Sequence, residues 1–191
     1  MDKPAIGFAL CGSFCTFEQA INEMEKLKNT GYDITPIMSF NAFKTDTRFG
    51  KAAAHIERIE NICGKKIIST IPDAEPIGPK KLFDILVIEP CTGNTAAKLA
   101  RSITDTPVTL AAKAHLRNNR PVVIAISTND ALSGSAENIG KLMNMRNIFF
   151  VPFRQDDPKT KPRSMIADFT KTEETVLSAI NKIQIQPMIS G

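Results

Sequence analysis

The sequence predicts an α/β protein: a three-layer α/β/α, Rossmann-like fold around a mostly parallel sheet of about six strands. Short apolar runs rich in β-branched residues alternate with longer segments that have helical periodicity. The central runs are apolar at nearly every position, as in Ile-Leu-Val-Ile at 85–88, which is typical of strands covered on both faces. A length of 191 residues fits a single domain, expected to span residues 1–191.

The expected strands are short and bounded by glycine, proline or polar residues. They cover residues 6–10, 33–38, 66–71, 85–89, 122–127 and 148–153. A repeated strand–helix–strand order requires right-handed crossovers, which place helices on both faces of the sheet. The expected architecture is therefore doubly wound, of the flavodoxin-like class.

The expected helices carry apolar residues at intervals of three and four. They cover residues 16–29, 48–63, 94–103, 109–118, 136–145 and 173–183. Thr16 is the expected N-cap of the first helix, and Gly64 is expected to end the second. Residues 72–79 and 154–163 show neither period and are expected to be long irregular loops, which in compact domains are often functional.

Composition argues against several classes of function. There are 24 basic and 20 acidic residues, one tyrosine and no tryptophan, so the clustered basic and aromatic footprint of a nucleic-acid-binding protein is missing. Neither a transmembrane run nor a signal-peptide pattern is found. The four cysteines form no C-x-x-C pair and lie far from both histidines, so no metal site is expected. A cytoplasmic protein that binds neither nucleic acid nor membrane is expected.

A ligand is expected at the carboxyl ends of the first and fourth strands, where the strand order of a doubly wound sheet reverses. The two loops there are Cys-Gly-Ser-Phe-Cys-Thr at 11–16 and Pro-Cys-Thr-Gly-Asn-Thr at 90–95. Each precedes a helix, whose free N–H groups favour a phosphate or another anion. Such hydroxyls also serve simply as helix caps, but two loops together favour a ligand. Ser39 and Lys113 are further candidates. Neither the dinucleotide nor the P-loop fingerprint is present.

Residues 83–100, Phe-Asp-Ile-Leu-Val-Ile-Glu-Pro-Cys-Thr-Gly-Asn-Thr-Ala-Ala-Lys-Leu-Ala, resemble the P-[AS]-[ST]-A-N-T signature of the flavoprotein family and the strand that leads to it. That family includes flavin-dependent cysteine decarboxylases and flavin prenyltransferases. Gly-Ser at 12–13, Thr-Pro at 35–36 and Lys-Ala at 113–114 also match its layout. The resemblance implies an FMN site in a homo-oligomer. The positions carried over are Gly12, Ser13, Ser39, Pro90, Thr92, Gly93, Asn94, Thr95 and Lys113.

Within the family, the chain is similar to the dipicolinate synthase branch. Glu-Pro-Cys-Thr-Gly-Asn-Thr at 89–95, Ser-Thr-Asn-Asp-Ala-Leu at 127–132, Val-Pro-Phe-Arg-Gln-Asp-Asp-Pro at 151–158 and Lys-Pro-Arg-Ser at 161–164 carry this similarity. It implies an oxidoreductase subunit that takes part in oxidising a dihydrodipicolinate-type precursor to dipicolinate (pyridine-2,6-dicarboxylate) in sporulation. The implied partner is the A-type subunit of dipicolinate synthase, which carries NADP.

A small dicarboxylate substrate needs cationic partners, best supplied by arginine. The candidate substrate-binding residues are therefore Arg154, in the basic loop, and Asn129. Asn129 is the last residue of Ile-Ser-Thr-Asn at 126–129, which stands where decarboxylases have P-x-M-N.

The catalytic residues stay unassigned, because the histidine that decarboxylase members carry before the aspartate of strand four has no counterpart at 72–81. A flavin prenyltransferase, a flavin-dependent decarboxylase and a non-catalytic partner subunit therefore remain alternatives. Two residues near the signature are ambiguous. Glu89 is either buried with a raised pKa or ion-paired, and an ion pair is expected. Cys91 is either a reactive thiol or a small packed residue, and packing is expected.

Overall fold

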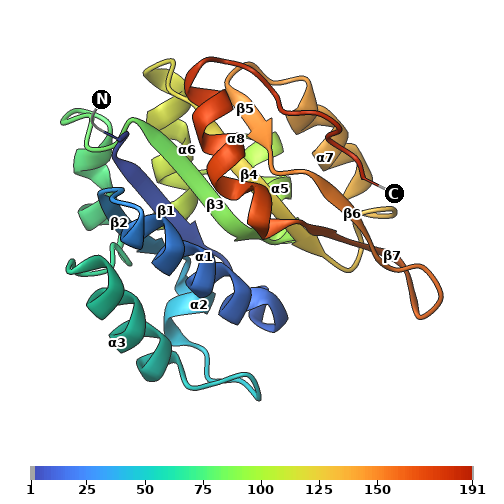
Figure 1. Ribbon diagram of the computed structural model, residues 1–191, viewed down its shortest axis with the longest axis horizontal. Coiled ribbons are helices and arrows are strands. Elements are labelled where there is room, and N and C mark those ends of the chain that lie inside the picture. Colours follow the sequence, from blue (N-terminus) through green and yellow to red (C-terminus); the bar gives the residue numbers. More distant parts are fainter. Residues whose placement is uncertain (1–2, 191) are drawn as a thin grey trace.

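The computed structural model describes residues 3–190, and its seven strands form one mostly parallel sheet (Figure 1). The parallel part has the order β2-β1-β3-β4-β5. Its strands are β1 (Ile6–Leu10), β2 (Ile34–Met38), β3 (Ile85–Cys91), β4 (Val122–Thr128) and β5 (Ile148–Phe150). This is the flavodoxin-like order, with its switch point between β1 and β3. The predicted fold class is confirmed.

Helices cover both faces of this sheet. Helices α1 and α8 contact it on one face, and α5, α6 and α7 lie on the other, with α3 packed beside α1 and β2 (Figure 1). None of the helices over residues 3–190 has the length and apolarity to cross a membrane. The helices are α1 (Phe17–Asn29), α2 (Phe40–Lys44), α3 (Ala52–Cys63), α4 (Ile71–Ala74), α5 (Gly93–Ala100), α6 (Pro107–Arg117), α7 (Ala136–Met143) and α8 (Thr172–Ile180), with 3-10 turns η1 (Phe14–Thr16), η2 (Glu75–Ile77) and η3 (Phe169–Lys171).

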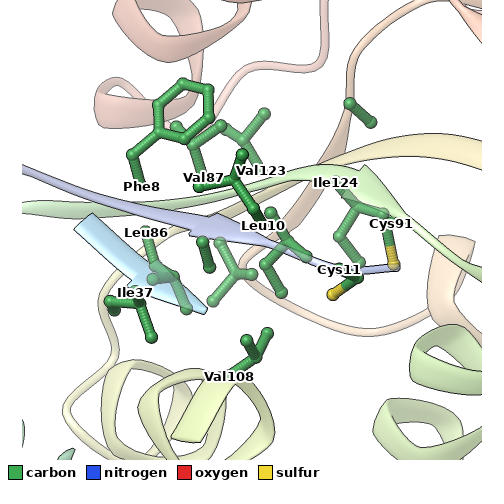
Figure 2. Packing of buried hydrophobic residues seen from close by; sticks show 14 of the residues in the cluster. Phe8, Leu10, Cys11, Ile37, Leu86, Val87, Cys91, Val108, Val123 and Ile124 are labelled. Atoms are coloured by element: carbon green, nitrogen blue, oxygen red, sulfur yellow. The ribbon is translucent and has the colours of Figure 1, made fainter. Parts of the chain in front are cut away.

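The core lies between the helices and the three central strands, β1, β3 and β4. Every residue of β1 and β3 is buried, as is all of β4 except its last residue. Figure 2 shows Phe8 and Val87 on one side of the sheet, and Leu86 with Val108 of α6 on the other. Because apolar side chains cover both faces, these strands appear in the sequence as continuous apolar runs.

The strand predicted over residues 66–71 is wrong. Only Ile68 pairs with β2, through a single bridge in which its N–H donates to Pro36 O at 2.9 Å and its carbonyl accepts Met38 N at 3.0 Å. Pro36 has no N–H to donate at this outer edge, so the ladder cannot continue past it. Thr70 then accepts the amide of Asp73 and begins α4.

The irregular loop predicted over residues 154–163 is also wrong, because these residues form an antiparallel hairpin of β6 (Phe153–Asp157) and β7 (Lys161–Ala167). Met165 and Ile166 of β7 pair with Thr128 and Ser127 of β4, beyond the part of β4 that pairs with β5. The hairpin tip projects from the body of the molecule (Figure 1). Pro158 lies in the hairpin tip, where Asp157 accepts the amides of Lys159 and Thr160. It therefore does not interrupt the pairing of β6 with β7.

The predicted second helix begins four residues late, at Ala52. Before it, Thr47 and Gly50 close a tight turn by exchanging two backbone hydrogen bonds of 3.0 and 3.1 Å. The short helix α2 was not predicted; it starts where Ser39 Oγ accepts the amide of Ala42. Gly64 ends α3 in the left-handed conformation (φ +66°), as expected.

Candidate functional site

Two adjoining cavities lie where the carboxyl ends of β1, β3 and β4 meet at one edge of the sheet. The large cavity, about 630 Å³, lies between η1, the 47–50 turn, the end of β4 and the β6–β7 hairpin. The small cavity, about 260 Å³, lies between the loops that follow β1, β2 and β3. Gly12 and Thr92 line both cavities. The predicted switch-point loops therefore form the shared wall of a two-part site.

The small cavity presents groups suited to an anion. Thr92 caps α5 by accepting the amide of Thr95 at 3.2 Å, and its carbonyl accepts the amide of Ala96. These bonds use the amides of Thr95 and Ala96. Within the described residues, the amides of Gly93 and Asn94 are the remaining donors in the first turn of α5. The capped N-terminus of α6 and Lys98, which pairs with Asp105 at 2.9 Å, line the same cavity, as does the predicted Ser39.

Gly93 brings α5 into close contact with the loop after β4. A Cβ atom at this position would collide with Ser135 Oγ and would lie 2.8 Å from both Asp130 Oδ1 and Thr128 Oγ1. The two hydroxyls donate to Asp130 at 2.6 and 2.9 Å, so the cluster is held in place. Only glycine fits here, which explains why this chain departs from the alanine of the flavoprotein signature.

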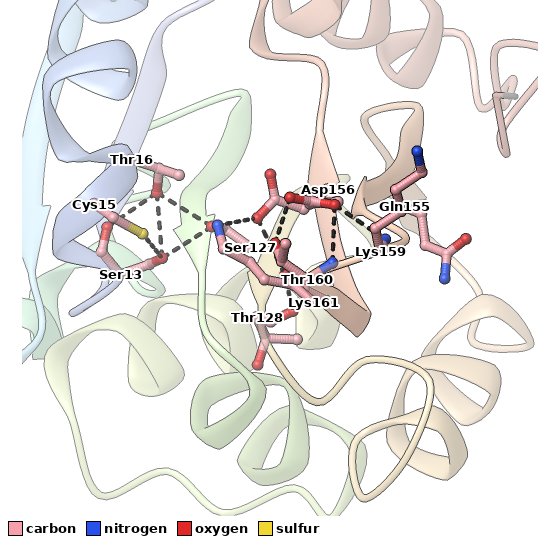
Figure 3. Close-up of polar contacts among 12 residues, drawn as sticks. Ser13, Cys15, Thr16, Ser127, Thr128, Gln155, Asp156, Lys159, Thr160 and Lys161 are labelled. Carbon is pink, nitrogen blue, oxygen red and sulfur yellow. Dashed lines mark hydrogen bonds and ion pairs between the residues drawn. The ribbon is translucent and has the colours of Figure 1, made fainter.

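Three hydroxyls form the inner wall of the large cavity (Figure 3). The hydroxyls of Ser13 and Ser127 share a hydrogen bond of 2.9 Å, and that of Thr16 lies 3.2 Å from Ser127 Oγ. Thr16 occupies the N-cap position of α1, as predicted, but its hydroxyl donates to Ser13 O at 2.9 Å instead of capping the helix. The sequence analysis did not name Ser127 as a site residue, although it ends a predicted strand and begins the 127–132 stretch that carries the family resemblance.

Charged and apolar side chains complete the large cavity. Lys161 of β7 pairs with Asp156 of β6 at 2.7 Å, and this interaction raises the pKa of the lysine. Arg48 lies over the ring of Phe49, 4.8 Å from its centroid. Phe14, Phe49, Met165 and Ile166 supply apolar surface. The cavity therefore suits a small, flat molecule with negatively charged groups.

The structure does not bring every predicted residue to this edge. Asn129 lines the large cavity, and the carbonyl of Pro90 accepts the amide of Cys11 in the wall behind it. Arg154 instead lines a separate cavity of about 530 Å³ on the α1 side of the hairpin, together with Glu23, Lys26 and Asp168. Lys113 is exposed on α6 and lines neither site cavity.

Two thiols beside the site, those of Cys11 and Cys91, are packed inside the protein, whereas Cys15 is exposed and lines the large cavity. Cys11 directly follows β1, Cys91 ends the neighbouring β3, and both are buried (Figure 2). Burial raises the pKa of Cys11 to about 11 and that of Cys91 well above its usual value. Cys91 is therefore a packed residue, as expected, and not an activated nucleophile. Among the described residues, no group of three His, Cys, Asp or Glu side chains is placed to hold a metal.

The ion pair expected for Glu89 is wrong. Its side chain is fully buried, and no cation among residues 3–190 pairs with it. Oε2 accepts the hydroxyl of Thr172 at 2.5 Å, whereas Oε1 has no partner. Burial, and to a lesser extent the negative charge of Glu23, raise the pKa of this carboxyl well above the usual range. The folded protein therefore favours the neutral form of Glu89 more strongly than the unfolded chain does.

Comparisons with known proteins bear on this geometry. The family model described as Flavoprotein matches residues 1–184. The B-type subunit of dipicolinate synthase from Bacillus subtilis (strain 168) is 48% identical over 184 residues, which cover 96% of this chain and 92% of that protein. The crystal structure of the corresponding B-type subunit from Bacillus halodurans C is 42% identical, with a TM-score of 0.90, and covers 98% of this chain and 96% of that one.

A more distant structure shares the fold alone. DmrB of Burkholderia xenovorans, solved in complex with FMN as a cubic protein cage for redox transfer, is 14% identical, with a TM-score of 0.68. The match covers 93% of this chain and 96% of that chain.

Proposed function

This chain belongs to the flavoprotein family, and on that premise we propose that it binds FMN and acts as the B-type subunit of a dipicolinate synthase. Such a synthase oxidises a dihydrodipicolinate-type precursor to dipicolinate. The observation that carries the proposal is the pair of cavities that share Gly12 and Thr92 at the switch point. The relatives that are 48% and 42% identical over nearly the whole chain support the choice of reaction.

The donor set of the small cavity fits the phosphate-bearing end of FMN. Asn94 and Thr95 in the first turn of α5, Thr106 at the start of α6 and the ammonium of Lys98 line it, so an anion would meet two helix N-termini and one cation. When bound, FMN supplies the capacity to accept a hydride. The protein's own part is to hold the substrate in the adjoining large cavity.

The large cavity would hold the substrate. Its hydroxyls at Ser13 and Ser127 offer hydrogen bonds to carboxylate oxygens, and Asn129 adds an amide at the rim. The aromatic rings of Phe14 and Phe49 offer surfaces for a planar ring. Arg154 has no place in this arrangement, since it lines the cavity on the other side of the hairpin.

The synthase would be completed by other chains. The relatives carry the name of a B-type subunit, which supports an A-type partner, and the assignment of NADP to that partner follows from the resemblance to the dipicolinate synthase branch. A homo-oligomer of this chain, working in the cytoplasm during sporulation, completes the proposal. Lys113, exposed on α6, is free to contribute to a neighbouring copy.

The FMN assignment predicts a yellow protein. The purified chain, saturated with FMN, should show oxidised-flavin bands, and heat should release a molecule with the mass of FMN. Thr92→Val removes the cap of α5 in the shared wall and should weaken FMN binding about tenfold, the effect of losing one net hydrogen bond. Fluorescence titration of FMN measures this affinity.

Thr70→Val is the matched control, because Thr70 caps α4 in the same way but lines neither cavity. It should lower stability by about 1 kcal/mol and leave FMN affinity unchanged. A colourless chain that takes up no added FMN would refute the cofactor assignment.

A further inference from the structure

The tight turn between α2 and α3 carries Arg48 and Phe49 to the mouth of the large cavity. Besides the two backbone bonds between Thr47 and Gly50, the amide of Phe49 donates to Thr47 Oγ1 at 3.1 Å. Asp46 Oδ1 accepts the amide of Ala52 at 2.8 Å, which ties the turn to the first residue of α3. The backbone of Arg48 is therefore held in one position.

His55 of α3 packs against this turn. A Cβ atom on Gly50 would lie 2.5 Å from His55 Nε2, and Gly50 has a φ of +143°, so only glycine allows this approach. The ring of His55 in turn packs edge-on against Phe17, with centroids 5.2 Å apart. Packing from Phe17 through His55 to Gly50 thus supports the turn that carries Arg48.

Arg48 differs from the other charged groups of the large cavity in having no ionic partner. Lys161 is already paired with Asp156, which is the carboxylate that lines this cavity. Within the described part of the chain, Arg48 makes no ion pair, and its guanidinium lies over the face of Phe49. A guanidinium stacked on a ring keeps its N–H edge available for an oxygen pair.

We infer that Arg48 binds one carboxylate of the substrate and thereby selects a dicarboxylate over a monocarboxylate. A guanidinium matches a carboxylate with two parallel N–H···O bonds, a geometry that lysine cannot supply. Lys161 and the hydroxyls of Ser13 and Ser127 are placed to receive the other carboxylate. This inference rests on the proposed function, from which it takes the dicarboxylate substrate.

The test compares two probes, dipicolinate and its monocarboxylate analogue picolinate, titrated by calorimetry into the full chain saturated with FMN. The wild-type protein should prefer dipicolinate. Arg48→Gln should weaken dipicolinate binding by about 10- to 100-fold, the value of a charged hydrogen-bond pair, and leave picolinate binding nearly unchanged. The preference between the two probes should therefore disappear. Arg48→Lys should restore only part of it.

Arg154→Gln is the matched control, since it removes the same charge from the other side of the hairpin and should change neither affinity. If the wild type binds dipicolinate and Arg48→Gln keeps the full preference, the assignment of Arg48 is refuted while the proposed function stands. If Arg48→Gln weakens FMN instead, Arg48 serves the cofactor and the inference fails. A wild-type chain that binds neither probe refutes both the dicarboxylate site and the role of Arg48.

Discussion

Glu89→Gln is expected to remove a steep loss of stability that the wild-type protein suffers as pH rises. In the unfolded chain Glu89 ionises near its ordinary pKa of 4.5, whereas burial keeps it protonated in the folded protein to a much higher pH. Between these two values the folded state binds one more proton than the unfolded state. The free energy of unfolding should therefore fall by about 1.4 kcal/mol for each pH unit in this window.

Glutamine has the shape of a protonated glutamate and can still accept the hydroxyl of Thr172. Urea unfolding at steps from pH 4.5 upward should show the wild-type and variant curves diverging as pH rises, with the variant more stable. Glu137→Gln, at a side chain that is 82% exposed, is the control and should leave the slope unchanged. Parallel curves for wild type and Glu89→Gln would contradict a protonated Glu89.

A second buried group, His115, changes stability with pH in the opposite direction. The comparison of wild type with Glu89→Gln must therefore remove its effect. His115 is buried against Phe83, and burial lowers its pKa from 6.5 to about 4. It is neutral in the folded protein, so the stability that it contributes is complete above pH 6.5 and is lost as pH falls toward 4. Because His115 is present in both proteins, the difference between wild type and Glu89→Gln isolates the carboxyl.

Gly93→Ala is expected to disturb both stability and FMN binding. The added methyl group would collide with Ser135 Oγ and with two atoms of the Asp130 cluster, so α5 must shift away from the loop after β4. Overpacking of this kind costs about 1–3 kcal/mol. Because Gly93 begins the helix that faces the small cavity, FMN affinity should fall as well. Thermal unfolding and flavin titration measure the two effects.

A second substitution tests the cause. Ser135→Ala removes the atom nearest the added methyl group, so the double variant should recover part of the lost stability and FMN affinity. Gly140→Ala is the matched control, because a Cβ atom there meets nothing within 4 Å in α7. It should stabilise the protein by about 0.5–1 kcal/mol, the gain expected in a helix interior. Equal effects at both glycines would contradict the packing explanation.

The central strands were predictable because their signal is local. β1, β3 and β4 are buried on both faces, so each of them appears in the sequence as a continuous apolar run. The errors at 66–71 and 154–163 concern segments whose structure depends on distant residues. Residues 66–71 have strand composition, but the end of their pairing is decided by Pro36 on the neighbouring strand. The β6–β7 hairpin is polar and contains prolines, and it is held by pairing with the end of β4.

The site was predictable only in part, for a similar reason. Hydroxyls and glycines in the loops at 11–16 and 90–95 could be placed together, since the topology of the sheet brings these loops to one edge. Arg48 was assigned to the start of a helix, because nothing in the sequence shows the turn closed by Thr47 and Gly50. Arg154 and Lys161 lie in one basic segment, and only the pairing of the hairpin shows which of them lines the large cavity.

The wall formed by Gly12 and Thr92 has a thermodynamic consequence. Gly12 and Thr92 give two ligands a shared contact through which they can influence each other, and any coupling between them must be equal in both directions. If dipicolinate binds more tightly beside oxidised than beside reduced FMN, the reduction potential of the flavin must fall when dipicolinate binds, by the same free energy. The protein would thus sense its own product through the cofactor, without any change in the fold.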